Sequence, residues 1–272
     1  PHGNRAMTNL IFAVKRASLD DGNGIRTVFF LKGCPLRCSW CHNPESQAAQ
    51  AHIEFDPPRC LDCGRCRAAC PTGALAASGP LRIDAARCIR CGVCAQACFS
   101  GALRRVGRHY DIDVLCALAL RDKPYYAASG GGVTFSGGEP LIHARYVGLA
   151  AKRLHEEGIS VDVQTCGQFG YAAFRRHVAA YIDTVYFDVK LADPREHLRH
   201  TGRGNRRILE NLMRLTDDGI RVIPRTPCIP GITDTPENLE GIAALLERLG
   251  LREAHVLLPC NNTSKRPRLR LI

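Results

Sequence analysis

A cysteine motif that occurs twice constrains the fold of this chain more than any other feature. The segment RCLDCGRCRAACPTGAL at 59–75 returns 28 residues later as RCIRCGVCAQACFSGAL, and each copy carries the spacing C-x2-C-x2-C-x3-C. Proteins with this spacing hold two [4Fe–4S] clusters, and the fourth cysteine of each copy ligates the other cluster. A pair of zinc sites is the alternative. The repeat predicts one cluster on Cys60, Cys63, Cys66 and Cys98 and a second on Cys88, Cys91, Cys94 and Cys70.

The repeat interrupts a chain of different character. Of the 272 residues, we assign 55–105 to an inserted, ferredoxin-like domain and 8–54 with 106–272 to a discontinuous core. In the core, short apolar strands alternate with amphipathic helices, which is typical of a parallel α/β sheet. Because six strands are too few for a closed eight-stranded barrel, we predict a partial (β/α)6 barrel, with a doubly wound sheet as the alternative. The predicted strands are 27–31, 133–135, 161–165, 184–189, 221–225 and 254–258, and the predicted helices are 112–121, 142–157, 171–181, 206–217 and 236–249.

Three further cysteines follow the first predicted strand directly. Cys34, Cys38 and Cys41 have the spacing C-x3-C-x2-C, and no fourth cysteine follows in that loop. Three thiolates hold three irons of a [4Fe–4S] cluster and leave the fourth iron without a protein ligand. A free position is typical of a catalytic metal site, whereas structural sites are closed. The loop therefore predicts a cluster that binds a small molecule.

The second predicted strand ends in two glycines and a glutamate. Gly137 and Gly138 allow a ligand to approach the backbone, and Glu139 adds a negative charge, so the three residues suit a positively charged amine. An ordinary turn is the alternative. Because the carboxyl ends of parallel strands lie at one mouth of such a fold, this segment is predicted to face the cysteine loop.

Two later strand ends carry charged residues. Asp188 and Lys190 lie two residues apart and therefore share one face of their strand, where Lys190 is suited to hold a carboxylate. An ion pair without further function is the alternative. Arg225 ends the fifth predicted strand and is suited to a carboxylate or a hydroxyl. Before the first strand, residues 20–25 are predicted to form a turn, and Arg26 is interpreted as a residue with a structural role.

Composition limits the location and the partners. Fifteen cysteines in a chain without a signal-peptide segment indicate metal sites in a cytoplasmic protein. No apolar run is long enough to span a membrane. The net charge of +11 is not accompanied by an aromatic and basic patch, so we predict no nucleic-acid binding. The four cysteines outside the motifs are predicted to be small buried apolar side chains, namely Cys116, Cys166, Cys228 and Cys260.

Four segments, in this order, resemble one family: DGNGIRTVFFLKGCPLRCSWCHNPES, SGGGVTFSGGEPL, YFDVKL and IPRTPCIPGITD. They are similar to the activating enzymes of glycyl radical enzymes, which belong to the radical S-adenosylmethionine (SAM) superfamily. The resemblance covers about residues 10–260. The simplest member of this family is the pyruvate formate-lyase activating enzyme. The repeat is similar to the ferredoxin insert found in the longer branch of the family.

The resemblance implies a reaction and a set of residues. The open iron on Cys34, Cys38 and Cys41 would chelate SAM, and reductive cleavage would give methionine and a 5′-deoxyadenosyl radical. That radical would abstract a hydrogen atom from a glycine Cα of the partner. The cofactors would be SAM and three [4Fe–4S] clusters, one with an open iron and two of ferredoxin type. The residues implied to contact SAM are Trp40, His42, Gly137, Gly138, Glu139, Asp188, Val189, Lys190, Arg225 and Asn261.

The resemblance also implies a glycyl radical enzyme as the protein substrate, a flavodoxin or ferredoxin as the electron donor, and a monomer. The chain departs from the family at Asn23, where proline is usual, at Gln164, where many members have an acidic residue, and after Pro259. Two alternatives remain open. One is another radical SAM enzyme with auxiliary clusters, such as a peptide-modifying maturase, and the other is an electron carrier without enzymatic activity.

Overall fold

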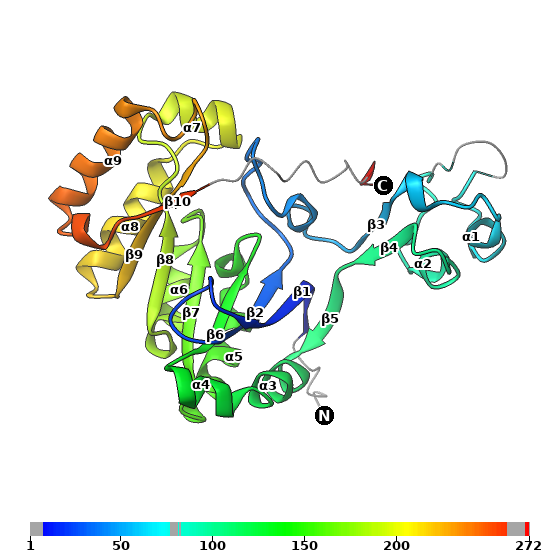
Figure 1. The fold of residues 1–272 in the computed structure, drawn as a ribbon, viewed down its shortest axis with the longest axis horizontal. Helices are drawn as coiled ribbons and strands as arrows, with labels where there is room; N and C mark the ends of the chain where they lie inside the picture. Colours follow the sequence, from blue (N-terminus) through cyan, green and yellow to red (C-terminus); the bar gives the residue numbers. More distant parts are fainter. Residues whose placement is uncertain (1–7, 77–80, 82, 260–269, 272) are drawn as a thin grey trace. The chain divides into compact units, whose positions relative to one another are not determined.

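The structure is a computed structural model that describes residues 8–76, 81, 83–259 and 270–271 (Figure 1). The chain divides into two compact units. The larger unit contains residues 8–49 and 109–259, and the smaller unit contains residues 50–108 and 270–271. Asn261, which the resemblance implied as a SAM contact, and Cys260 lie outside the described residues.

The larger unit is built on one mixed sheet. Within the described residues it has eight strands in the order β10-β9-β8-β7-β6-β2-β1-β5 (Figure 1). The strands from β10 to β2 in this order pair in parallel, and β1 pairs antiparallel with β2. The bounds are β1 Thr8–Ser18, β2 Arg26–Leu31, β5 Arg108–Asp111, β6 Gly132–Gly137, β7 Ser160–Thr165, β8 Thr184–Asp188, β9 Val222–Cys228 and β10 Val256–Pro259.

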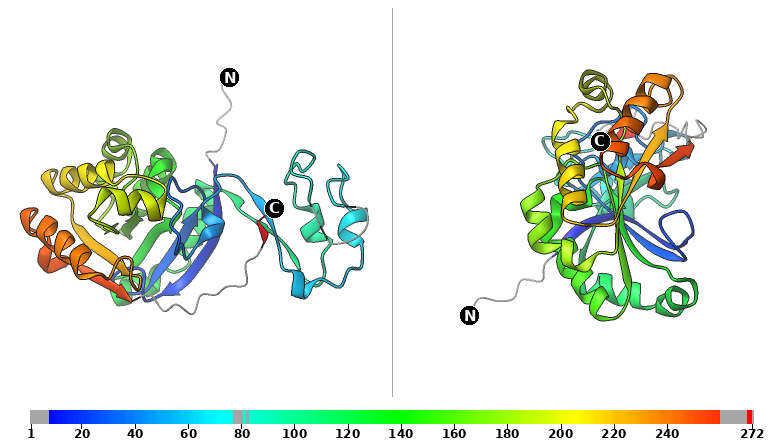
Figure 2. Two further views of the ribbon diagram at one scale, coloured as in Figure 1. Left: turned by 90° about the horizontal axis from the view of Figure 1, so that it is seen from above. Right: turned by 90° about the vertical axis from the view of Figure 1, so that its left-hand side faces the viewer.

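The central strands bury one apolar face in the main core. Val133, Val161, Val163 and Phe187 lie on that face and have no measurable exposure to solvent, whereas alternate residues such as Asp162 are polar and point to the other face. Helices follow the strands along the chain and pack on the sheet (Figure 2). Their bounds are α3 Ile112–Leu120, α4 Lys123–Ser129, α5 Ala144–Glu156, α6 Tyr171–His177, α7 Pro194–Thr201, α8 Arg206–Asp217 and α9 Pro236–Arg248, with 3-10 turns η1 Pro44–Ser46, η3 Pro140–His143, η4 Ala179–Tyr181 and η5 Arg252–Ala254.

Side chains at the helix starts explain several boundaries. The carboxylate of Asp193 accepts hydrogen bonds from the backbone N–H groups of Arg195 and Glu196 at the start of α7. Thr235 caps α9 in the same way through the N–H of Asn238. Such caps satisfy donors that have no partner inside the helix, and each stabilises a helix by about 1 kcal/mol.

The six predicted strands are present, and helix 206–217 has the predicted bounds. The prediction was incomplete elsewhere. In the larger unit β1, β5, α4 and the polar α7 were not predicted, and the strands of the smaller unit were not predicted either. The predicted helix 171–181 is divided, since α6 ends at His177 and a 3-10 turn begins at Ala179.

In the smaller unit, the two copies of the sequence repeat have similar backbone conformations. β3 His52–Phe55 pairs antiparallel with β4 Leu103–Val106, and β11 Arg270–Leu271 pairs with β3. The other elements are η2 Pro57–Arg59, α1 Arg65–Ala68 and α2 Val93–Gln96. Gly64 and Gly92, which precede the two helices, both have positive φ angles, of 72° and 85°. Because a side chain is strained there, the glycine recurs in both copies.

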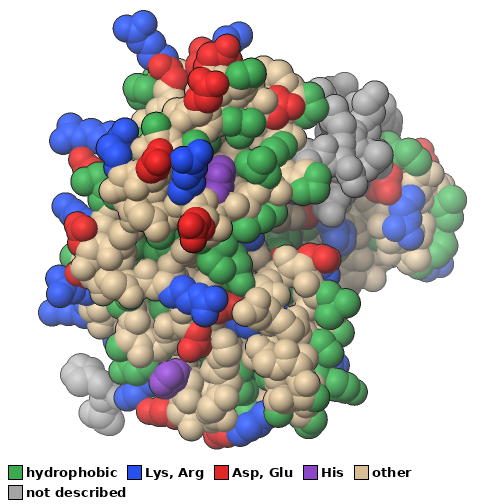
Figure 3. Space-filling view, turned by 60° about the vertical axis from the view of Figure 1, so that its left-hand side comes forward, with side chains coloured by type: hydrophobic (Ala, Val, Ile, Leu, Met, Phe, Trp, Pro, Cys, Tyr) green, Lys and Arg blue, Asp and Glu red, His purple; other side chains and the backbone are tan. Residues whose placement is uncertain are grey.

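Two surface properties bear on the predicted partners. In the part of the chain that is described, no helix is long and apolar enough to cross a membrane. The face in Figure 3 carries Lys and Arg side chains interspersed with Asp and Glu, so positive charge on that face is not gathered into one patch.

Candidate active site

A cavity of about 330 Å³ lies in the larger unit at the carboxyl ends of the parallel strands. Its size is in the range of small-molecule sites. Ten of the predicted site residues line it: Cys34, Cys38, Trp40, Cys41, His42, Gly137, Gly138, Asp188, Lys190 and Arg225. Glu139 and Val189 are not among the lining residues. The fold thus gathers residues from the ends of β2, β6, β8 and β9 around one space.

The cysteine loop is held in place by its own backbone contacts. Its first residues are fixed to the turn that follows, because the N–H of Gly33 donates to the carbonyl of Ser46 at 2.7 Å. Its middle is fixed to the end of α7, where the N–H of Arg37 donates to the carbonyl of Thr201 at 2.7 Å. The Arg37 guanidinium also donates to the carbonyl of Cys34 at 2.7 Å. These hydrogen bonds fix the start and the middle of the loop to neighbouring segments of the chain.

The two glycines at the end of β6 serve packing of the protein on itself. A Cβ on Gly138 would lie 2.2 Å from the carbonyl oxygen of Gly33, and a Cβ on Gly137 would lie 2.4 Å from the backbone of Leu31. Both distances are far below contact. The glycines thus allow the end of β6 to lie directly against the start of the cysteine loop. From the sequence alone, the two glycines were predicted to make room for a ligand.

Glu139 lies beneath the cavity. Its side chain has no exposure to solvent, and its carboxylate accepts hydrogen bonds from the N–H of Leu141 at 3.0 Å, the hydroxyl of Thr165 at 2.7 Å and the N–H of Cys166 at 2.8 Å. Burial raises the pKa of this carboxyl. The carboxylate therefore braces the turn after β7, and the geometry does not support its predicted contact with an amine.

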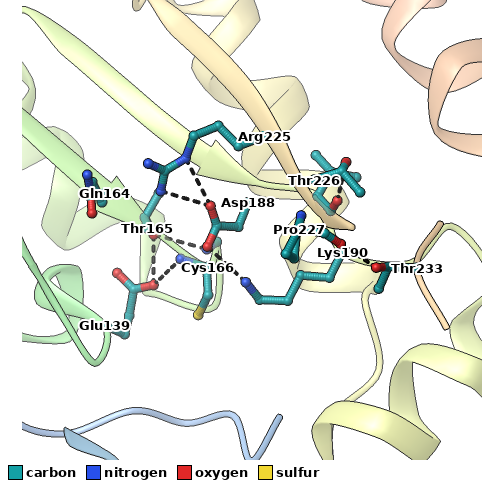
Figure 4. Close-up of polar contacts among 12 residues, drawn as sticks. Glu139, Gln164, Thr165, Cys166, Asp188, Lys190, Arg225, Thr226, Pro227 and Thr233 are labelled. Atoms are coloured by element: carbon teal, nitrogen blue, oxygen red, sulfur yellow. Dashed lines mark hydrogen bonds and ion pairs between the residues drawn. The ribbon is translucent and has the colours of Figure 1, made fainter. Parts of the chain in front are cut away.

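Asp188 is held between two cations, as Figure 4 shows. The Lys190 ammonium lies 2.8 Å from one of its oxygens, and the Arg225 guanidinium lies 2.9 Å from the other. Burial alone would raise the pKa of the Asp188 carboxyl, but the two neighbouring cations lower it below its usual value. The same pairing keeps the pKa of Lys190 above its usual value despite burial. Together, Asp188, Lys190 and Arg225 carry a net positive charge, which is suited to bind an anion.

Val189 separates Asp188 from Lys190 and points away from the cavity. Its side chain is buried, its N–H donates to the carbonyl of Arg225 at 2.8 Å, and its carbonyl accepts the hydroxyl of Thr226 at 2.8 Å. Val189 thus fixes the two charged residues on one side of the chain, and these contacts do not support a direct contact with a ligand.

Sequence reasoning missed an acidic loop at the cavity. Asp20 and Asp21 line the cavity, although the segment was predicted only as a turn. The side chain of Gln164 links Asp21, at 3.1 Å, to the hydroxyl of Ser136, at 2.7 Å. The only sequence feature that could have indicated this position is the pair of carboxylates before the first parallel strand. Their place on the cavity follows from the fold, which brings this loop to the ends of the strands.

The acidic loop rests on a buried ion pair. Arg26 donates to the hydroxyl of Thr134 at 2.6 Å and lies 3.1 Å from Asp162, and both charged side chains are almost fully buried. A Cβ on Gly22 would lie 2.5 Å from the Arg26 side chain and 2.7 Å from the Asp162 carboxylate. The structural interpretation of Arg26 is thereby supported.

The scattered cysteines are not equivalent. Cys116 is buried in the core, as predicted. Cys166 is also buried, but it lines the cavity together with Cys34. Its burial was predicted, but its place on the cavity was not, because spacing along the chain cannot show that the ends of β2 and β7 lie close together. Cys228 is only partly buried, so the prediction of a buried side chain was wrong there.

The smaller unit has two hollows, each lined by four motif cysteines. One is lined by Cys60, Cys63, Cys66 and Cys98. The other is lined by Cys70, Cys88, Cys91 and Cys94. Each set takes three cysteines from one copy of the repeat and one from the other, which is the arrangement that the spacing predicts.

Known protein families match most of the chain. The radical SAM superfamily matches residues 86–246, a 4Fe-4S dicluster domain matches residues 52–99, and a 4Fe-4S single cluster domain matches residues 20–64.

Individual relatives are similar over nearly the whole chain. The (2S)-3-sulfopropanediol sulfolyase activating enzyme of Bilophila wadsworthia is 39% identical over 250 residues, covering 90% of this chain and 82% of the relative. The benzylsuccinate synthase activating enzyme of Thauera aromatica is 41% identical, covering 87% and 73%. The pyruvate formate-lyase 2-activating enzyme of Escherichia coli is 36% identical, covering 96% and 80%.

These matches agree with the cysteine loop and the strand-end residues that line one cavity. They do not support a peptide-modifying maturase or a non-enzymatic electron carrier. The chain belongs to the radical SAM superfamily and, within it, to the activating enzymes of glycyl radical enzymes.

Proposed function

We propose that the cavity binds SAM beside a [4Fe–4S] cluster held by Cys34, Cys38 and Cys41. One observation carries this proposal: the three cysteines share a cavity with the charged group of Asp188, Lys190 and Arg225. The donor set fits the cluster, because thiolate sulfur is its usual ligand and three thiolates leave one iron free. When reduced, the cluster supplies the electron that cleaves SAM to methionine and a 5′-deoxyadenosyl radical, which takes a hydrogen atom from a glycine Cα.

The residues of the chain have separate tasks in this proposal. Lys190 and Arg225 provide positive charge for the carboxylate of the methionine moiety, and Asp188 fixes both cations and faces the ribose. The turn at Gly137 and Gly138 meets the amine through its backbone, since the Glu139 carboxylate is enclosed.

Two aromatic residues line the cysteine side of the same cavity. Trp40 and His42 are placed there by the loop that carries the cluster, so they are suited to contact the bound SAM. The Trp40 ring also lies 6.0 Å from the ring of His200, the residue before the anchor at the end of α7.

The architecture proposed for the two units follows the sequence prediction. The six parallel strands support a partial (β/α)6 barrel as the SAM-binding core. The crossed cysteine sets support two further [4Fe–4S] clusters in a ferredoxin-like insert at 55–105, which gives three clusters in all. The sequence assigned the remainder, 8–54 and 106–272, to the core, but β11 and most of β3, which come from these ranges, pair with each other in the smaller unit.

The partners follow from the family. The protein substrate is a glycyl radical enzyme, and the relatives are named for lyases, a synthase and a dehydratase. A flavodoxin or a ferredoxin is the proposed electron donor to a monomeric, cytoplasmic protein. A basic protein with a net charge of +11 is suited to an acidic donor. No nucleic acid takes part.

Cofactor cleavage tests the proposal directly. The protein is loaded with iron and sulfide without oxygen, reduced with dithionite and given SAM, and 5′-deoxyadenosine is measured. Cys38→Ala is expected to abolish the product, whereas Cys116→Ala, which removes a buried cysteine outside the cavity, retains it. Absence of the product from the fully loaded parent protein would refute the proposal. The glycyl radical signal of a lyase encoded next to this gene then identifies the substrate.

A further inference from the structure

The carboxyl-terminal end of α7 holds the middle of the cysteine loop. The N–H of Arg37 donates to the carbonyl of Thr201 at 2.7 Å, and the N–H of Ser39 donates to the carbonyl of His200 at 3.0 Å. The last carbonyls of a helix have no partner inside the helix, so the loop satisfies two of them. Cys38 stands between the two donors. Its backbone is therefore flanked on both sides by hydrogen bonds to the same helix end.

A buried histidine shapes this helix end. His197, one turn before Thr201 on α7, is 1% exposed, and Thr201 is fully buried. The ring nitrogen Nδ1 of His197 lies 2.6 Å from the carbonyl oxygen of Arg203, which can only accept, so Nδ1 carries the proton and donates. The Thr201 hydroxyl lies 3.0 Å from the same nitrogen and donates to the carbonyl of His197 at 2.7 Å. The ring thus closes the turn at Gly202, where the helix ends with a φ of 74°.

The same turn is fixed to the strand that leads to Lys190. Asn205, which follows the turn, is 3% exposed, and its side-chain amide donates to the backbone carbonyls of the two residues after Lys190, at 3.0 Å and 2.8 Å. Lys190 follows the end of β8 and lines the cavity. The segment 197–205 therefore joins the exit of β8 to the cysteine loop, so its shape determines where Cys38 lies relative to Lys190.

We infer that His197 is a positioning residue for the SAM site: it holds the end of α7 in the conformation that places Cys38 relative to Lys190. This inference rests on the proposed function, in which Cys38 is a cluster ligand and Lys190 binds SAM. His197 is not among the residues that line the cavity, so it acts through Thr201 and the backbone of the loop. A ligand that touches two sides of a cavity binds best when both sides are held in the right geometry before binding.

Two substitutions of nearly equal size isolate the hydrogen bond of the ring. His197→Asn keeps an N–H donor close to the position of Nδ1, whereas His197→Leu has a similar shape without a donor. In His197→Leu the carbonyl of Arg203 loses the donor at 2.6 Å and keeps the Thr201 hydroxyl at 3.1 Å, so the helix end is expected to loosen. Tyr146→Phe is the matched control, because it removes the hydrogen bond of a buried side chain to the carbonyl of Tyr110, away from the cavity.

The measurements are made on the fully loaded protein. Hydrogen–deuterium exchange, resolved to single residues, follows the amides of Arg37 and Ser39, and equilibrium binding gives the SAM affinity. His197→Leu is expected to speed exchange at both amides about fivefold and to weaken SAM binding about fivefold, the effect of losing one hydrogen bond. His197→Asn is expected to stay within about twofold of the parent protein in both measurements. Iron content and thermal melting are measured on the same samples, so a loss of cluster or a global loss of stability is not mistaken for a local change.

The outcomes separate a positioning role from a role in stability. Faster exchange and weaker SAM binding in His197→Leu, with values near those of the parent in His197→Asn and Tyr146→Phe, support the inference. Equal values in the two His197 variants overturn it, because the hydrogen bond of the ring would then have no effect. A lower melting temperature in His197→Leu with unchanged exchange and unchanged SAM binding also overturns it, because His197 would then serve stability alone.

A second variant covers the case in which His197→Leu does not fold. Thr201→Val removes the buried hydroxyl and keeps the carbonyl that accepts from Arg37. Compared with Tyr146→Phe, faster exchange at Arg37 and Ser39 with weaker SAM binding supports the inference, and unchanged values overturn it. Failure of the proposed function shows differently, because the parent protein would then bind no SAM, or a SAM-sensitive cluster signal would persist in Cys38→Ala.

Discussion

The guanidinium of Arg26 lies 3.1 Å from the carboxylate of Asp162, with both side chains almost fully buried. Arg26→Met would leave the Asp162 charge without its partner and would remove the donor to Thr134. We expect the free energy of unfolding to fall by about 3–5 kcal/mol, the usual effect of breaking a buried pair. Urea denaturation measures it. Arg206→Met, at an exposed arginine, is the control, and an equally small effect of both changes would contradict the expectation.

The pH dependence of stability has a contribution from Asp162. Burial raises the pKa of this carboxyl from 3.8 to about 6, although Arg26 opposes the shift. The folded protein therefore binds this proton more tightly than the unfolded chain, and the stabilisation is complete below pH 3.8 and decreases as the pH rises through 6. Asp162→Asn is expected to show a smaller loss of stability than the parent protein between pH 5 and pH 7.5. Equal losses in denaturation experiments at the two pH values would count against this assignment.

Lys190 is predicted to contribute to SAM affinity. Lys190→Met removes a charge from the cavity and leaves Asp188 paired with Arg225 alone. A hydrogen bond to a charged group contributes about 1.5–3 kcal/mol, so SAM is expected to bind about 10- to 100-fold more weakly. Equilibrium binding to the cluster-loaded protein measures this affinity. Lys152→Met, on the exposed side of α5, controls for the loss of a lysine, and unchanged affinity in Lys190→Met would exclude the assigned role.

Gly138 is predicted to be intolerant of any side chain. In Gly138→Ala the new Cβ would lie 2.2 Å from the carbonyl oxygen of Gly33, so the end of β6 and the start of the cysteine loop must separate. We expect a loss of about 1–3 kcal/mol in stability and weaker retention of iron by that loop. Gly170→Ala is the matched control, because its Cβ meets nothing within 4 Å and its φ is −85°. Thermal melting and iron analysis compare the two.

The two kinds of cluster site are predicted to be separable. Cys38→Ala and Cys63→Ala should each remove about four irons per chain. Only Cys38→Ala should prevent the cleavage of SAM with dithionite, because Cys38 lines the SAM cavity and Cys63 lines a hollow of the smaller unit. Loss of cleavage in Cys63→Ala would show that dithionite reduces the cavity cluster through the insert.

Spacing and periodicity were sufficient for much of the fold and the site. The strands of the sheet are recognisable because their alternate residues are apolar and buried in the core. Cysteine spacing correctly grouped the cysteines that line each hollow of the smaller unit. α7 was missed because it is short and polar, and its stability depends on the Asp193 cap and on contacts with the rest of the unit. The enclosure of Glu139 and the position of Cys166 on the same cavity as Cys34 depend on the order of neighbouring strands in the sheet. A sequence pattern does not encode that order.

The anchoring of the cysteine loop to the end of α7 has a consequence for biosynthesis. The loop emerges from the ribosome early, but its backbone partners at His200 and Thr201 are made much later. The motif cysteines of the insert, by contrast, all lie between Cys60 and Cys98. Since contacts distant in sequence form late and local ones form early, the motif cysteines of the insert are expected to come together on a nascent chain whose catalytic loop is still unshaped. Only β11, the third strand of the small sheet, must then wait for the end of the chain. The two cysteine groups are therefore expected to take shape in the reverse of the order in which they are translated.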